Sequence, residues 1–240
     1  MSALRTARME ADCGIRSSWY ILHTSPYYGN WKEDVFLRHS CMRHIYRQIE
    51  DMGHEIGLHT DGLHVYQGWG ADGAAAVREE IEWLREAGLK IEGTTAHNSV
   101  GAYGACNYAI FKGRQKALWD KPGECPDSMT FQGKTALLQQ LDEKELGLRY
   151  ECNELFWQDH SSVGYGCIMA SDNWHWEEEK ANARILVQMR EGTHRESESL
   201  TAEKLLQTLA DVPKGTFLNL VVHPVYYGWR HVANSEPARS

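Results

Sequence analysis

The sequence lacks any apolar run that approaches the roughly 20 residues needed to cross a lipid bilayer. Its N-terminal segment, MSALRTARMEADCGIRSS, lacks the apolar central stretch of a secretory signal and is instead typical of an amphipathic helix. Basic charge is also scarce, because 25 lysine and arginine residues are outnumbered by 33 aspartate and glutamate residues. We therefore expect no membrane span, no nucleic acid partner and a cytoplasmic location.

The sequence also lacks a cysteine pattern typical of disulfides or of a cysteine-based metal site. Its six cysteines show neither CxxC spacing nor clustering, and in a chain of 240 residues this favours reduced thiols. The apolar fraction of 42% and the charged fraction of 24% are typical of a globular protein. We expect a single domain over residues 1–240.

Segments typical of strands alternate with segments typical of helices along the chain. Apolar and aromatic runs predict strands at 16–22, 55–58, 91–96, 108–111, 148–152, 166–170 and 216–222. Apolar residues one helical turn apart predict helices over 34–52, between Asp72 and Gly88, and over 135–146 and 201–211. This alternation indicates an α/β fold with parallel strands joined by right-handed crossovers.

Four of the predicted strands end on a residue that can bind a metal ion or transfer a proton. These residues are His59, His97, Asp172 and His223. In a β/α barrel the carboxyl ends of the strands converge on one face, where active sites are found. The sequence therefore predicts a functional site at that face.

The segment GHEIGLHTDGLH, residues 53–64, contains the most specific pattern. His59 and His64 flank Asp61, and imidazole together with carboxylate suits Zn²⁺ and similar divalent ions. The alternative is that His59 packs at a strand end with its ring bonded to backbone, and that His64 lies in a loop.

This segment resembles the second signature of the polysaccharide deacetylases, a carbohydrate esterase superfamily. LNLVVHPVYY resembles the last signature of that family, and ARMEADCGIRSSWYIL resembles its first helix and second strand. TTAHNS lies where a central substrate-side signature falls, and ASDNWHW resembles a segment of an atypical branch linked to surface polysaccharides. The resemblance covers about residues 4–230.

The resemblance implies a distorted β/α barrel of about seven strands that removes N-acetyl groups from a sugar or polysaccharide. It implies a divalent metal ion, most simply zinc, with His59 and His64 as ligands. By the same resemblance the catalytic groups are a proton donor and a general base, and the substrate is contacted by residues after the late strands. The expected catalytic residues are His223, Asp61 and His97, and the expected substrate-binding residues are Asp172, Trp174 and Tyr226.

The chain departs from the family pattern in three respects. The family's first signature, a strand ending in paired acids, should precede Leu4, so we expect the domain to be incomplete at its N-terminus. His59 and His64 are five residues apart instead of four, which leaves Asp61 or His97 as alternatives for the second ligand. The central Arg-Pro signature is absent.

Two other functions therefore stay open. One is a degenerate, non-catalytic carbohydrate-binding barrel, and the other is a metal-dependent hydrolase of another non-peptide C–N bond. Without the first strand, the strand at 16–22 should lie at an open sheet edge. We expect the N-terminal helix, a loop or a second copy of the chain to cover that edge, and we expect the deacetylase activity of the chain alone to be weak.

Overall fold

A computed structural model describes residues 2–32, 35–97, 107–113, 127–131, 133–152, 167–171, 185–191, 194–200, 207, 210 and 217–221. The chain forms two compact units, Ala3–Leu155 and Phe156–Ser240. Both contain strands, and the first also contains the described helices of more than one turn. The expectation of a single domain over 1–240 stays a prediction.

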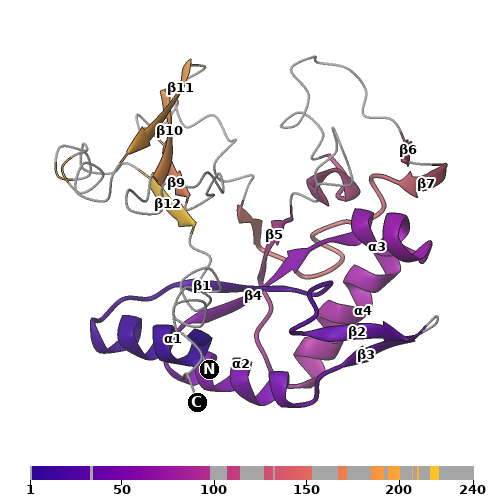
Figure 1. Cartoon of the computed structure of the whole chain (residues 1–240), viewed down its shortest axis with the longest axis horizontal. Coiled ribbons are helices and arrows are strands. Elements are labelled where there is room, and N and C mark those ends of the chain that lie inside the picture. The colour runs from indigo at the N-terminus through magenta and orange to yellow at the C-terminus, as the bar shows by residue number, and fades with distance from the viewer. Residues whose placement is uncertain are drawn as a thin grey trace, which may run out of the picture. The chain divides into compact units, whose positions relative to one another are not determined.

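The first unit is built on a four-stranded parallel sheet with the order β1–β4–β5–β8 (Figure 1). Its strands are β1 (Ser18–Leu22), β4 (Glu55–Thr60), β5 (Gly93–Ala96) and β8 (Tyr150–Glu151). The strands predicted at 16–22, 55–58, 91–96 and 148–152 are thus confirmed, as is the α/β class. Strand β1 ends the sheet order, as expected, and among the described residues its pairing partner is β4.

Three helices pack with this sheet: α1 (Ser2–Asp12), α2 (Cys41–Asp51) and α4 (Gly73–Glu86) (Figure 1). Alternate residues of the strands, such as Ile56 and Leu58 of β4, are fully buried in one apolar core with residues of these helices. The helix predicted between Asp72 and Gly88 is confirmed. The core residues contributed by α4 are Ala74, Val77, Ile81 and Leu84.

Local chemistry explains where α4 begins and ends. The Asp72 carboxylate accepts hydrogen bonds from the N–H groups of Ala74 and Ala75 at 2.9 and 3.0 Å, which caps the first turn. These bonds and a third from Tyr66 outweigh the opposing effect of burial and hold the pKa of Asp72 below its ordinary value. Gly88 follows the helix with φ of 85°, a left-handed conformation that glycine adopts without strain.

The first unit also contains the hairpins β2–β3 and β6–β7 and two short helices. Their bounds are β2 Gly29–Lys32, β3 Val35–Arg38, β6 Ser128–Phe131, β7 Lys134–Leu137, α3 Gly62–Trp69 and the 3₁₀ helix η1 Asn107–Ile110. In the second unit the sheet order is β11–β10–β9–β12, with β9 Cys167–Ser171, β10 Ile185–Glu191, β11 His194–Leu200 and β12 Phe217–Val221. Strands β9 and β12 match the predictions at 166–170 and 216–222, and they are parallel. The sequence did not predict β10 and β11.

Two predicted elements are wrong, and a third is right only in part. The helix predicted over 34–52 is confirmed as α2 over Cys41–Asp51, but Val35–Arg38 form strand β3, because Phe36 pairs with Trp31 across a hairpin and leaves Leu37 half exposed. Residues 135–146 begin with strand β7, because Gly133, with φ of 79°, lies between two strands that pair antiparallel. Residues 108–111 belong mostly to η1 and not to a strand. The helix predicted over 201–211 lies mostly outside the described residues.

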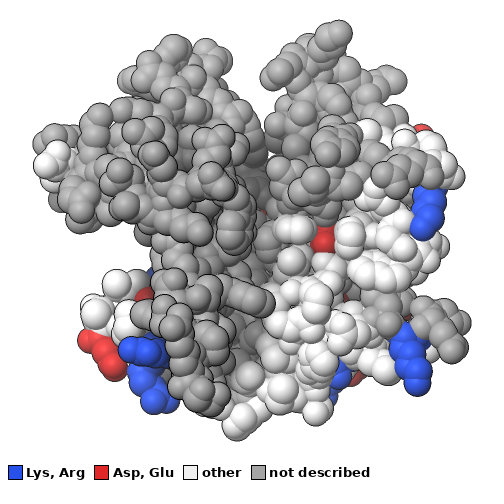
Figure 2. All heavy atoms as spheres, viewed as in Figure 1, with Lys and Arg blue, Asp and Glu red and all other residues white. Residues whose placement is uncertain are grey.

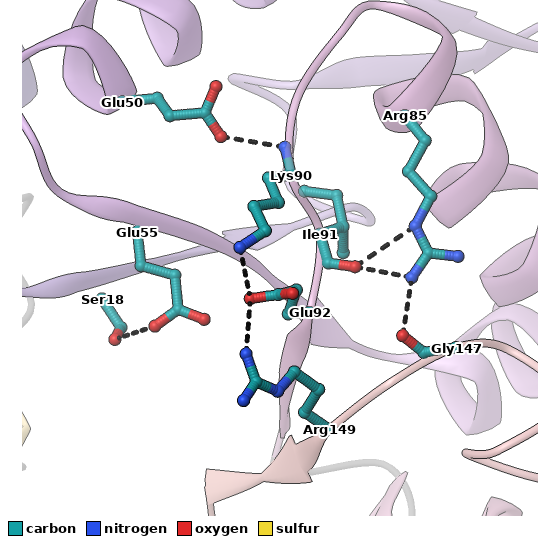
Figure 3. Close-up of polar contacts among 9 residues, drawn as sticks. All are labelled: Ser18, Glu50, Glu55, Arg85, Lys90, Ile91, Glu92, Gly147 and Arg149. Atoms are coloured by element: carbon teal, nitrogen blue, oxygen red, sulfur yellow. Dashed lines mark hydrogen bonds and ion pairs between the residues drawn. The ribbon is translucent and has the colours of Figure 1, made fainter.

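Polar contacts tie together the segments that lead into β5 and β8 (Figure 3). The Arg85 guanidinium, from α4, donates to the carbonyl oxygen of Ile91 at 3.2 and 2.5 Å and to that of Gly147 at 3.2 Å. The N–H of Lys90 donates to the carboxylate of Glu50, from α2, at 2.8 Å. These bonds join the amino-terminal ends of the strands to the helices, so the opposite, carboxyl-terminal edge of the sheet is where loops can form a site.

In the part of the chain that the structure describes, no helix is long and apolar enough to cross a membrane. On the face of the molecule that Figure 2 shows, the described lysine and arginine side chains lie in separate groups near the margins.

Candidate active site at the carboxyl ends of the parallel strands

Polar residues follow directly on three neighbouring strands of the first sheet. His23 follows β1, Asp61 follows β4 and His97 follows β5. The parallel register pairs Leu22 with His59 and His59 with Thr95, so the carboxyl ends of the three strands lie at one edge. Of the four strand-end residues that the sequence predicted to converge, His59 and His97 lie together at this edge, and Asp61 joins them.

Asp61 and His97 form a close pair at this edge. Nδ1 of His97 lies 3.2 Å from Oδ1 of Asp61, and the side chains are 34% and 2% exposed respectively. The N–H of His97 also donates to the carbonyl oxygen of Thr60 at 2.8 Å, which holds the end of β5 beside β4. A buried carboxylate beside one ring nitrogen of a partly exposed histidine fixes the orientation of the ring, which is an arrangement used by proton-transferring histidines.

His59 belongs to the same group but lies inside β4, one residue before its end. Its ring meets that of His97 edge to face, with centroids 4.8 Å apart and planes at 90°. The sequence placed the end of the strand at Leu58, one position before His59, and the strand continues to Thr60 because β5 pairs with it there. His59 is half-buried, which fits a residue at the rim of the sheet.

His23, Thr24 and Asn107 complete the surroundings of Asp61, and the sequence analysis did not select any of them. The Thr24 hydroxyl donates to Oδ2 of Asp61, and Nδ2 of Asn107 donates to Oδ1 at 2.8 Å. The N–H of Asp61 donates to Nε2 of His23 at 2.9 Å. The signal for His23 was present, because it follows the predicted strand at 16–22, whereas Asn107 lies in an irregular stretch with no local signal.

His23 is held in its neutral form. Burial of its ring lowers the pKa of His23 to about 4, and the neighbouring Asp61 carboxylate offsets only part of this effect. Because Nε2 of His23 accepts a hydrogen bond from the backbone N–H of Asp61, the ring proton of neutral His23 lies on Nδ1. His23 thus acts as a hydrogen-bond acceptor that fixes the backbone of Asp61.

His64, the other predicted metal ligand, lies on α3. Its ring packs edge to face against that of Trp69, with centroids 5.0 Å apart and planes at 88°. The five-residue spacing from His59 therefore bridges a strand and a helix that meet at Asp61. The assignment of His64 as a ligand stays a prediction.

The described residues supply only part of a metal site. Two imidazoles, those of His59 and His97, lie close together and suit zinc, but a zinc site takes three or four protein ligands. Within the described ranges, no group of three histidine, cysteine, aspartate or glutamate side chains could hold one ion. The carboxylate of Asp61 already accepts hydrogen bonds from Thr24 and Asn107. The described residues by themselves therefore do not fit a metal ion.

The remaining predicted site residues, Asp172, Trp174, His223 and Tyr226, lie outside the described residues. The strands before two of them are described: β9 ends at Ser171 and β12 ends at Val221, and these two residues are register partners in a parallel pair. The strand ends that precede Asp172 and His223 thus lie side by side within the second unit.

No family model, curated protein or solved structure matches the chain. The function must therefore be argued from the geometry of the site and from the sequence motifs.

Proposed function

We propose that the chain is a hydrolase that removes N-acetyl groups from a sugar or polysaccharide. In this proposal His97 transfers the proton and Asp61 orients its ring. The observation that supports the chemistry is the 3.2 Å pairing of His97 Nδ1 with the buried Asp61 carboxylate at the carboxyl edge of a parallel sheet. The similarity of GHEIGLHTD and LNLVVHPVYY to polysaccharide deacetylase signatures supports the substrate class.

The proposal includes a distorted β/α barrel of about seven strands. Two observations support parallel strands: β1, β4, β5 and β8 pair in parallel in the first unit, and β9 and β12 pair in parallel in the second, where β9 also has the antiparallel neighbour β10. His59, Asp61 and His97 lie at carboxyl ends of these strands, where active sites of barrels form.

The proposed reaction is the addition of water to the acetamide carbonyl. Nε2 of His97 accepts a proton from the water as its oxygen bonds to the carbonyl carbon, and the buried Asp61 stabilises the resulting imidazolium. The C–N bond then breaks, and the sugar amine leaves after it receives a proton from the imidazolium or from His223. The products are acetate and the free amino sugar. Asp172, Trp174 and Tyr226 are proposed to contact the sugar.

The proposal also includes a divalent ion, most simply zinc. His59 is its proposed ligand among the strand-end residues, with His64 as the second and further ligands from outside the described residues. When bound, such an ion polarises a carbonyl and lowers the pKa of water. Metal content of the purified chain, measured by elemental analysis before and after His59→Ala, tests this part of the proposal separately.

The purified chain should release acetate from N-acetylated sugar oligomers in an enzymatic acetate assay. Replacing His97 by glutamine should lower kcat by about 10²-fold or more, because the proton acceptor is lost. The matched control is His44→Gln, which alters an exposed histidine of α2 and should leave the rate unchanged.

Three outcomes would contradict the proposal. Binding of the sugars without acetate release would favour the non-catalytic carbohydrate-binding alternative. Hydrolysis of cyclic amides instead of N-acetyl sugars would favour a hydrolase of another C–N bond. Acetate release that is equal in the wild type and in His97→Gln would remove His97 from the reaction.

A further inference from the structure

The geometry around Asp61 assigns a role to Asn107. We propose that Asn107 is a positioning residue: its side-chain oxygen caps helix α3 in place of Asp61, and its side-chain nitrogen holds the Asp61 carboxylate on His97.

The N-cap of α3 is unusual. Asp61 precedes the first residue of the helix, Gly62, and an aspartate there normally accepts hydrogen bonds from the first free N–H groups of the helix. The Asp61 side chain makes no such bond. Its oxygens instead accept from Thr24 and Asn107 and lie beside Nδ1 of His97.

Asn107 supplies the missing cap from a distant part of the chain. Its Oδ1 accepts a hydrogen bond from the N–H of Leu63, the second residue of α3, at 2.7 Å. Asn107 is fully buried at the start of η1, so water does not replace this contact. An N–H group of the first turn that would otherwise need Asp61 is therefore satisfied by Asn107.

The cap also fixes which way the Asn107 amide faces. Because Oδ1 must meet the N–H of Leu63, the two hydrogens of Nδ2 face the other partners, which are both acceptors. Nδ2 donates to Oδ1 of Asp61 at 2.8 Å and to the backbone carbonyl oxygen of His97 at 2.7 Å. One amide thus joins the helix cap, the carboxylate and the end of β5.

The same oxygen of Asp61 meets both Nδ2 of Asn107 and Nδ1 of His97. On the other side, the Thr24 hydroxyl donates to Oδ2. The carboxylate is therefore held between the segment that follows β1 and η1, in the orientation that presents Oδ1 to His97. Removing Asn107 should return Asp61 to the cap of α3 and away from His97.

The test is the position of the proton on the neutral His97 ring, read from histidine side-chain ¹H–¹⁵N correlation spectra at alkaline pH. In the wild type the proton should lie on Nδ1, facing Asp61. In Asn107→Ala the ring should shift to the Nε2–H form that is usual for a free imidazole. A helix that has merely lost a cap would not change this signal, so Asp72→Ala, which uncaps α4, is the matched control and should leave His97 unchanged.

Asn107→Asp keeps the inference testable if the alanine variant does not fold. An aspartate retains an oxygen for Leu63 but has no N–H for Asp61, and the two carboxylates repel each other. The fold should survive and the Nδ1–H form of His97 should still be lost. A wild-type His97 signal in either folded variant would overturn the inference.

The kinetic part of this inference rests on the proposed function. Asn107→Ala should lower kcat for acetate release by about tenfold to a hundredfold with little change in KM, because the base is misplaced while the substrate contacts remain. If the wild type releases no acetate, the proposed function is wrong, and the His97 spectra still decide the role of Asn107.

Discussion

Buried, neutral His23 should make the stability of the first unit depend on pH. In the unfolded chain a histidine has a pKa of about 6.5, whereas burial lowers the pKa of His23 in the folded protein to about 4. Between these values the unfolded state binds a proton that the folded state does not bind. The folded state therefore loses stability as the pH falls from about 6.5 towards 4.

The size of this effect follows from the shift in pKa. Each pKa unit corresponds to about 1.4 kcal/mol, so the full effect of His23 is about 3 kcal/mol, reached below pH 4. At pH 5, between the two pKa values, the titration of His23 should lower the free energy of unfolding by about 2 kcal/mol. At pH 7.5 it should lower it by almost nothing. His23→Gln removes the titrating ring and retains an oxygen that can accept from the N–H of Asp61.

The assay is urea unfolding at pH 7.5 and 5.0, followed by tryptophan fluorescence, to which Trp19 and Trp83 of the first unit contribute. On going from pH 7.5 to 5.0, the wild type should lose about 2 kcal/mol more unfolding free energy than His23→Gln loses. His44→Gln, at an exposed position of α2, should differ from the wild type by the same amount at both pH values. A difference that stays constant for His23→Gln would refute the assignment of a buried, neutral His23.

Three further changes test the packing of the first unit by thermal or urea unfolding. Gly57→Ala would place its Cβ 2.7 Å from the Gly93 carbonyl oxygen and should cost about 1–3 kcal/mol of stability. Gly68→Ala on α3, where no atom lies closer than 3.7 Å to the new Cβ, should stabilise the protein by about 0.5–1 kcal/mol. Equal effects of the two substitutions would contradict the close approach of β4 and β5. Asp72→Ala should cost about 1 kcal/mol by uncapping α4, and Asp72→Ser should recover most of it. Glu80→Ala should cost about 3 kcal/mol because it leaves Arg38, at 2.9 Å in the wild type, without its buried partner; a loss under about 0.5 kcal/mol would show that this pair contributes little.

Local signals in the sequence were sufficient to predict the elements whose first and last residues are marked by capping or stop residues. The helix between Asp72 and Gly88 carries an N-cap, an apolar face and a terminating glycine within one short segment, so its fold could be predicted without its neighbours. Strands β4 and β5 were predicted from their apolar runs, although the sequence ended β4 at Leu58 and the structure ends it at Thr60. Because the carboxyl ends of parallel strands share an edge, the proximity of His59 and His97 also followed from the sequence.

The spacing of apolar residues alone gave wrong predictions where the same residues fit either a helix or a strand followed by a loop. Leu138 and Leu141 have helical spacing and are fully buried, yet they follow strand β7, whose partner β6 lies just before Gly133. A hairpin is stabilised by cross-strand pairing and by the packing of its neighbours, which a window of one segment does not contain. The same reason applies to Leu37, which belongs to the hairpin β2–β3.

Only the tertiary structure decided how Asp61 is used. Its hydrogen-bond partners His23 and Asn107 are 38 and 46 residues away in the sequence, and neither forms a local motif with it. From the sequence, Asp61 followed by a helix would be a capping residue. The fold places Asn107 at that cap and so leaves the carboxylate for His97, because the partner of a buried polar group is set by which segments pack together and not by which residues adjoin it.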